Sequence, residues 1–329
     1  MKFRSILFAG TLMLLAITST LHAENLLFIA LSDNTIVTYD ASSAVSGTIQ
    51  ASRSIFIQTN LNAPSGMAFD SLGNLYVTNS KGNTISKFNS SGVFQSSIGS
   101  SSNLEQPIGL AIDSKDNLFA VNSGWFPRLD DMEPPVPSNS ISKFNSSGKF
   151  LTRISSMKLR NPAQITIDSA DNIYVANRNG NKPIISKLDS AGIYQSSITL
   201  DARTPARLST DSADNLYAIT FGGDVIKYNS SGLLHPNEGR FTLTAKYFID
   251  EARIERDVGP GSALLNPMAI TIDSSDNLYI ANRNGAICKF DGSGKYIIGW
   301  KIGSVEPSAL STFKQKSAKK LIPKTQSVK

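Results

Sequence analysis

Cysteine and histidine are scarce in this chain of 329 residues. Cys288 is the single cysteine, so no intrachain disulfide can form, and His22 and His235 are the only histidines. Two histidines leave little material for a histidine-rich metal site or for acid–base catalysis. The sequence also lacks a glycine-rich phosphate loop and a Gly-Xaa-Ser-Xaa-Gly nucleophile elbow. Several common catalytic classes are therefore disfavoured before any fold is considered.

Long apolar runs are missing from the chain except near its start. Lys2 and Arg4 precede an apolar stretch from Ile6 to Ile17, and Leu21-His22-Ala23 forms an acceptable cleavage site. This apolar core is shorter than the ~20 residues needed to cross a bilayer. We therefore predict a cleaved signal peptide over residues 1–23 and a secreted or periplasmic mature protein.

The positive charge is concentrated at the two ends of the chain. The formal net charge is +6, yet the last sixteen residues hold six lysines and no acid. Without these lysines and the two basic residues of the signal peptide, the chain has 24 basic and 26 acidic residues. A nucleic-acid partner is therefore not expected, because such a partner requires a basic face on the folded body. Residues 314–329 are predicted to be a basic, flexible tail that can contact an anionic surface weakly.

A repeated segment determines the expected fold. The segment Pro64 to Asn79 recurs from Pro107, Pro162, Pro205 and Pro267. Each copy reads as an inner strand, an Asp-Ser-Xaa-Gly/Asp-Asn turn and a second strand, followed by a third strand, a second turn and a fourth strand. Strands that are apolar on both faces fit between neighbouring sheets. Stacked four-stranded units of this length predict a β-propeller, with the polar turns explained by Asp side chains that bond their own backbone.

The sixth blade must be shared between the two ends of the chain. Leu26–Leu31, Thr35–Tyr39 and Ser54–Ile57 supply three strands of a first blade that lacks its inner strand. Glu306–Thr312 resembles the inner strand Thr204–Thr210 and is predicted to complete this blade, because an open ring would leave unpaired edges. We predict an all-β, six-bladed propeller over residues 24–313, expected to be monomeric.

The repeat resembles a known family. Pro-Xaa-Gly-Xaa-Ala-Xaa-Asp, Gly-Asn-Leu-Tyr-Val and Ile-Xaa-Lys-Phe, as found from Pro64 to Phe88, are similar to the NHL repeat. The resemblance covers about Asn25 to Thr312 and implies a six-bladed NHL-type propeller. It is specific for the fold and weak for function, because such propellers include scaffolds, sensor domains and a few enzymes.

Related propellers include metal-dependent lactonases and histidine-dependent lyases. The resemblance implies that lactonase metal ligands would follow the proline that opens each inner strand. Those positions are occupied here by Ser65, Ile108, Ala163, Ala206, Met268 and Ser308. None is a carboxylate or an amide, and a hard cation needs several oxygen ligands. We therefore expect no metal and no cofactor.

The candidate binding residues lie in insertions and loops that share one end of a propeller. Residues 124–138 carry Trp125, Phe126 and Arg128, types that are frequent at binding hot spots. Arg178 and Arg283 follow second strands, and Arg207 is expected at the channel mouth with Gln164. A second insertion lies between Gly232 and Pro267.

Two further expectations concern the third and fourth strands. Phe241–Ile249 is expected to be one long fourth strand followed by a charged loop, Asp250–Leu265, although the insertion could instead precede the strand and lie on the opposite face. The recurring lysines of the third strands are expected to be solvated tips: Lys87, Lys143, Lys187, Lys227 and Lys289.

The sequence favours a noncatalytic propeller that binds a protein or glycan partner. The alternative is a small-molecule hydrolase or lyase, lactonase-like, with its site at the mouth of the central channel. The two classes differ in whether acids or amides converge at that mouth.

Overall fold

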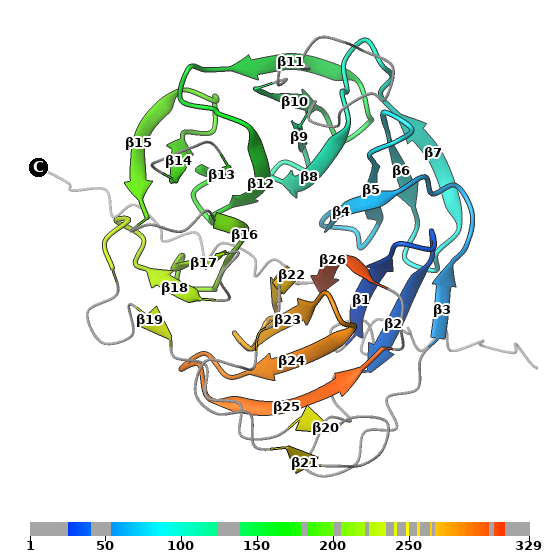
Figure 1. Cartoon of the computed structure of the whole chain (residues 1–329). Coiled ribbons are helices and arrows are strands. Elements are labelled where there is room, and N and C mark those ends of the chain that lie inside the picture. Colours follow the sequence, from blue (N-terminus) through cyan, green and yellow to red (C-terminus); the bar gives the residue numbers. More distant parts are fainter. Residues whose placement is uncertain are drawn as a thin grey trace, which may run out of the picture.

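The computed structural model describes residues 26–40, 54–123, 139–178, 183–200, 205–220, 224–234, 240–241, 248–249, 255–256, 264, 267–302 and 306–312. Within these ranges the chain forms six four-stranded antiparallel sheets arranged around one axis (Figure 1). The predicted signal peptide and basic tail lie outside the described residues. The described part contains no helix that could span a membrane.

Each blade runs from an inner strand at the axis to an outer strand at the rim. In that order, blade one contains β26 (Pro307–Thr312), β1 (Leu26–Leu31), β2 (Ile36–Asp40) and β3 (Ser54–Ile57); blade two β4 (Pro64–Phe69), β5 (Leu75–Asn79), β6 (Thr84–Phe88) and β7 (Phe94–Ile98); blade three β8 (Pro107–Ile112), β9 (Leu118–Asn122), β10 (Ser140–Phe144) and β11 (Phe150–Ser155). Blade four contains β12 (Pro162–Ile167), β13 (Ile173–Asn177), β14 (Ile184–Leu188) and β15 (Tyr194–Thr199); blade five β16 (Pro205–Thr210), β17 (Leu216–Thr220), β18 (Val225–Tyr228) and β19 (Arg240–Phe241); blade six β22 (Pro267–Ile272), β23 (Leu278–Asn282), β24 (Ala286–Phe290) and β25 (Tyr296–Lys301).

The ends of the chain close the ring as predicted. Strand β26 pairs antiparallel with β1, with Ile29 opposite Leu310 and Leu27 opposite Thr312. It also packs against the inner strands β4 and β22 on either side. The last described strand therefore occupies the gap in blade one and gives that blade four strands, like the other five.

The hydrophobic core is divided among the seams between blades. Each of six apolar clusters draws its side chains from two neighbouring blades. The second strands are fully buried, as in Leu75–Asn79, whereas outer strands such as β7 are mostly exposed. Burial on both faces explains why the second strands are apolar throughout and do not alternate.

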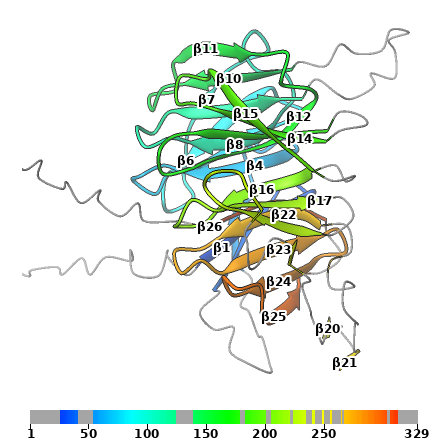
Figure 2. The same ribbon diagram turned by 90° about the vertical axis from the view of Figure 1, so that its left-hand side faces the viewer.

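The expected long fourth strand of blade five is wrong. Its two ends belong to different sheets: Phe241 pairs with Val225 in blade five, whereas β20 (Phe248–Ile249) pairs with β21 (Glu255–Arg256). This two-stranded sheet lies outside the ring, next to β25 of blade six (Figures 1 and 2). The chain leaves the edge of blade five after a short pairing and forms separate pairs beside the next blade.

Candidate functional site

The propeller has two chemically different ends. At the insertion face, the inner strands begin at their prolines and the loops between second and third strands emerge. At the turn face, the inner strands end in the Asp-Ser turns. Residues Trp125, Phe126 and Arg128 lie outside the described residues, so the candidate site on the insertion face is built here from Arg178, Arg207 and Arg283.

An asparagine at the end of the second strand organises the insertion face. In blade four, Asn177 Oδ1 accepts a hydrogen bond from the Arg160 backbone at 2.8 Å, and its Nδ2 donates to Ser186 Oγ at 3.0 Å. Ser186 Oγ donates in turn to the Lys158 carbonyl at 2.8 Å. These bonds hold the segment that leads from β11 into β12 against the end of β13. Arg178 directly follows Asn177.

Arg178 and Arg207 are brought together across blades four and five. Arg178 follows β13, and its backbone N–H donates to the Asn161 carbonyl at 3.0 Å. Arg207 is the third residue of β16, and its Nε donates to the Met268 carbonyl of blade six. Burial lowers the pKa of both guanidinium groups, and the positive charge of Arg178 lowers the pKa of Arg207 further. Two half-buried cations therefore lie within electrostatic range of each other.

Arg283 occupies a different position on this face. It follows β23 in blade six, and its Nε donates to Glu306 Oε1 at 2.9 Å. Both side chains are largely exposed, at 60% and 46%. This ion pair joins blade six to the start of the closing strand, and an exposed pair of this kind contributes little stability. The structure thus groups Arg178 with Arg207 and gives Arg283 a carboxylate partner.

The positions that would hold a lactonase metal are engaged in packing. Ser65 Oγ donates to the Pro107 carbonyl at 2.9 Å, and Ser308 Oγ donates to the Ala30 carbonyl at 3.2 Å. A Cβ atom at Gly66 would lie 2.9 Å from the Ile108 carbonyl oxygen, so blades two and three are in close contact here. In the described part of the chain, no three His, Cys, Asp or Glu side chains converge as metal ligands would. The residues present do not fit a lactonase metal site.

The turn face contains an interaction that sequence reasoning missed. The first Asp of each turn caps its own turn, as predicted: Asp168 Oδ1 accepts from the backbones of Ala170 and Asn172. The second Asp instead bonds the preceding blade. Asp214 accepts from the Ser169 backbone at 2.8 Å and from Ser169 Oγ at 2.7 Å.

The same pairing joins four successive seams. The pairs are Ser71–Asp116, Ser114–Asp171, Ser169–Asp214 and Ser212–Asp276. Each second Asp has a positive φ near 60°, a conformation that Asp tolerates. Blade two has Gly73 at this position, with φ 79°. The sequence does contain a signal for this interaction. The second Asp is absent only in blade two, and blade two follows the one blade that has no Asp-Ser turn to supply a serine.

The expectation of solvated lysines on the third strands is wrong. Strand register places each lysine opposite an aromatic residue, as with Lys87 and Tyr76 or Lys187 and Tyr174. All five ammonium groups lie 4.7 to 5.2 Å from the centroid of that ring. Lys227 is only 7% exposed and also lies 3.8 Å from Asp211. These lysines cover the seams as cation–π partners.

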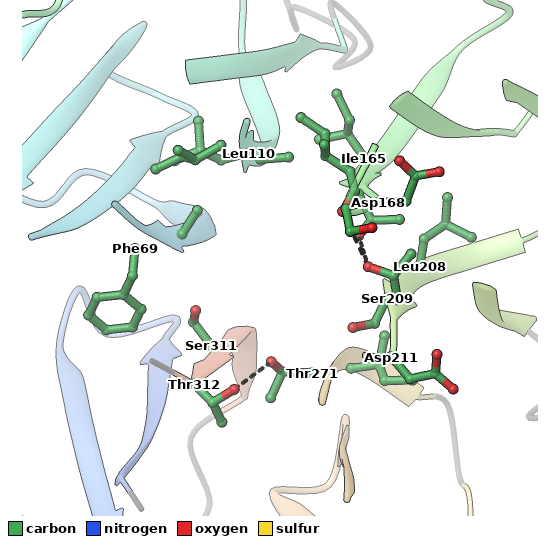
Figure 3. Close-up of a pocket in the computed structure, with 18 of the residues that line it drawn as sticks. Phe69, Leu110, Ile165, Asp168, Leu208, Ser209, Asp211, Thr271, Ser311 and Thr312 are labelled. Atoms are coloured by element: carbon green, nitrogen blue, oxygen red, sulfur yellow. Dashed lines mark hydrogen bonds between the residues drawn. The ribbon is translucent and has the colours of Figure 1, made fainter. Parts of the chain in front are cut away.

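The central cavity has its lining on the turn-face side of Arg207. Its volume is about 1190 Å³, and its walls run from Gln164 on β12 to the Asp-Ser turns. Figure 3 shows side chains from all six inner strands around it. Of the two residues predicted at one mouth of the channel, Gln164 lines the cavity and Arg207 does not.

Comparison with known proteins supports the fold. No family model matches the chain, and no curated protein sequence matches it. A chain in the crystal structure of a nidogen/laminin complex is 17% identical, with a TM-score of 0.64, over 87% of this chain and 97% of that one. A gluconolactonase from Xanthomonas campestris is 14% identical, with a TM-score of 0.59, over 88% and 91%. A streptogramin B lyase is 15% identical, with a TM-score of 0.57, over 88% and 87%. These structures share the propeller architecture and include both binding proteins and enzymes.

Proposed function

We propose that this chain is an exported, noncatalytic binding propeller whose insertion face recognises an anionic group on a protein or glycan partner. The observation that carries the proposal is the pairing of Arg178 and Arg207 across two blades. Two neighbouring cations attract a carboxylate, sulfate or phosphate group of a ligand. Guanidinium groups stay charged at neutral pH and bind such anions in a two-pronged geometry.

The predicted loop residues would extend this surface. Residues 124–138 connect β9 to β10 in blade three, so the loop starts and ends on the insertion face. Trp125, Phe126 and Arg128 are proposed to supply apolar contact area and one further cation beside the arginine pair. Arg283 is proposed to contribute from blade six, where its pairing with Glu306 would be exchanged for a partner's acid.

Catalysis ranks second because none of the described residues at the insertion face specifically favours it. A lactonase-like hydrolase or a lyase would need convergent acids, amides or histidines at the channel mouth. The described positions just after the opening prolines offer instead two serines bonded to carbonyl oxygens, together with apolar side chains. Similarity to a lactonase and a lyase at 14–15% identity supports the fold alone.

The proposal is tested by measuring the affinity of the full-length protein for matched acidic and neutral ligands. Oligosaccharides with and without uronic acid or sulfate, and peptides with and without Asp and Glu, would be compared by surface plasmon resonance. We expect binding of acidic ligands only, and a loss of about tenfold for Arg178→Met or Arg207→Met, because each removes a charge-assisted contact. Lys149→Met removes the same charge from an exposed turn at the opposite face and should leave the affinity unchanged.

Two outcomes would overturn the proposal. Equal affinity for acidic and neutral ligands would remove the role of the arginine pair. A stoichiometric calcium or zinc ion that raises the melting temperature would restore the enzymatic alternative. The contribution of the loop is measured separately with the double variant Trp125→Ala, Arg128→Ala, which should weaken the same ligands that Arg207→Met weakens.

A further inference from the structure

The cavity at the turn face is a separate potential binding site. Its volume of about 1190 Å³ is slightly larger than the ~300–1,000 Å³ typical of small-molecule sites. It is lined by the inner strands and by turn residues such as Ser71, Asp214 and Asp276, which place its opening at the turn face. The arginine pair lies toward the opposite end of the inner strands.

The wall of the cavity has two chemically distinct arcs. Blades two and three contribute an apolar arc that contains Met67, Phe69, Leu110 and Ile112. Blades five, six and one contribute a mixed arc, in which the hydroxyls of Ser209, Thr210, Thr271, Ser311 and Thr312 lie beside the apolar Leu208, Ile270 and Leu310. Figure 3 shows Phe69 and Leu110 on one side of the opening, Ile165 and Leu208 on the opposite side, and Ser209, Thr271 and Ser311 among the other side chains around it. Such a wall suits a ligand with an apolar body and one polar end.

Two hydroxyls of this arc remain available to a ligand. Thr210 Oγ1 donates to the Ile167 carbonyl at 3.3 Å, and Thr312 Oγ1 donates to the Ile272 carbonyl at 3.0 Å. Ser311 is only 7% exposed and lines the cavity, yet its hydroxyl makes no hydrogen bond within the described part of the chain. The half-buried Ser209 likewise lacks such a bond among the described residues. Both side chains line the cavity, so a polar group of a ligand can take either hydroxyl as its hydrogen-bond partner.

The charge in the lining has a single sign. Among the described residues that line the cavity, all charged side chains are aspartates of blades four, five and six: Asp168, Asp171, Asp211, Asp214, Asp273 and Asp276. The second aspartates accept hydrogen bonds from neutral serines, as Asp276 does from Ser212. Within the described ranges Asp171, Asp214 and Asp276 form no ion pair. Asp211 lies 3.8 Å from Lys227, so it is Asp171, Asp214 and Asp276 that supply the negative charge expected to attract a cation to the rim.

The arrangement favours an organic cation over a metal ion. The second aspartates lie one to a blade, each already bonded to the serine of the blade before it. No group of three potential metal ligands converges in the described structure. A metal ion needs several oxygens at one point, whereas an ammonium group is attracted by a spread of carboxylates.

We propose that the turn-face cavity binds an organic ammonium ion that carries an apolar body. The apolar body packs against Phe69, Leu110 and Met67, and the ammonium group faces Asp214 and Asp276. Ser311 provides a hydrogen bond from the wall between them. This site is independent of the arginine pair, so either site can be wrong while the other is right.

The test compares three probes that share one skeleton. Binding of 4-phenylbutylamine, 4-phenylbutanol and 4-phenylbutyrate to the full-length protein would be measured by isothermal titration calorimetry at pH 7. We expect the amine to bind about tenfold more tightly than the alcohol, the butyrate not to bind, and the preference for the amine to shrink at high salt. Equal affinity for amine and alcohol, or no binding of the amine at 10-millimolar concentrations (about the weakest measurable range), would overturn the proposal.

Matched variants locate the site within the protein. Asp276→Asn should weaken the amine about three- to tenfold and leave the alcohol unchanged, because the amide keeps an acceptor for Ser212 while removing the charge. Asp291→Asn removes the same charge from the outer turn of the same blade, which does not line the cavity, and should change neither probe. Ser311→Ala should weaken the amine without changing the melting temperature. If the two Asp variants weakened the amine equally, the binding would depend on the net charge of the protein alone, and the proposal that the amine binds in the cavity would be wrong.

Discussion

The two faces of this propeller hold neighbouring blades together in different ways. At the turn face, a charged Asp of one blade accepts two hydrogen bonds from a serine of the blade before it. At the insertion face, the acceptor is a neutral amide: Asn83 Oδ1 accepts from the Gln106 backbone at 2.7 Å, and Asn139 Oδ1 accepts from the Asn161 backbone at 2.7 Å. Charged acceptors form the stronger hydrogen bonds. The turn face is therefore the more tightly bonded end of the four seams that carry a Ser–Asp pair.

The two faces also differ in the charges that they carry. The turn face gathers aspartates that bond neutral donors, so their negative charge persists at the cavity rim. The insertion face carries both signs among the described residues, because Glu105, Asp224 and Glu306 lie on it together with Arg178, Arg207 and Arg283. Our two proposals accordingly place an anionic ligand at Arg178 and Arg207 and a cationic ligand at the turn-face cavity.

The largest effect is expected from the aspartates that cap their own turns. Asp168 is 8% exposed and accepts bonds from Ala170 N, Asn172 N, Asn172 Nδ2 and the Tyr174 hydroxyl. Asp168→Ala leaves these donors without an acceptor and should lower the free energy of unfolding by about 3–5 kcal/mol. Urea denaturation measures the loss. Asp189→Ala, in the exposed turn between β14 and β15, should cost under about 1.5 kcal/mol, and equal losses would contradict the ranking.

The second aspartates should matter less, and only where a serine precedes them. Asp214→Gly removes two bonds from Ser169, and glycine adopts the positive φ without strain, so a loss of about 1–3 kcal/mol is expected. Gly73→Asp introduces an aspartate at the matching place in blade two, where no turn serine precedes it. That variant should gain nothing. If Gly73→Asp stabilised the protein, the aspartate would act mainly within its own turn, and the Ser–Asp bond between blades would contribute little.

The sequence revealed the fold because each blade repeats the same chemistry. Pro, the Asp turn and the second turn of each repeat mark the strand ends, and the predicted strands Leu26–Leu31 and Ser54–Ile57 have the bounds that the structure shows. Closure by the last strand followed from the missing inner strand of blade one. The prediction of one long fourth strand in blade five is wrong because the apolar residues of Phe241–Ile249 fit a strand. The local sequence does not show that the two ends of this segment pair with different strands.

The sites were harder to predict because they depend on contacts between blades. The proximity of Arg178 and Arg207 follows from the placement of blades four and five, which no single repeat encodes. The hydrogen bonds that Ser169 donates to Asp214 could not be read from the sequence, because self-capping already explains an Asp-rich turn. The lysine contacts have another cause: Lys87 lies over Tyr76 of the neighbouring strand in the same blade, and this depends on the strand register.

At the insertion face, removal of the serine that supports the asparagine should have a moderate effect. Ser186 is fully buried, accepts from Asn177 and donates to the Lys158 carbonyl. Ser186→Ala should cost about 1 kcal/mol, less than the turn-face variants, because both partners are neutral. Ser196→Ala on the exposed outer strand β15 is the control, with no measurable change expected. A loss larger than that of Asp214→Gly would reverse the comparison of the two faces.

The smallest effect is expected where blade six replaces this serine by a thiol. Asn282 Nδ2 lies 3.8 Å from Cys288 Sγ, and burial raises the pKa of that thiol to about 12. The thiol should therefore stay protonated and resist alkylation by iodoacetamide at pH 8 until the protein unfolds. Cys288→Ser restores the Asn–Ser pair of blades two to four and should change the free energy of unfolding by less than about 0.5 kcal/mol, since a well-satisfied hydroxyl is nearly neutral. A loss above about 2 kcal/mol, near the desolvation cost of an unpaired hydroxyl, would show that blade six cannot accept this pair.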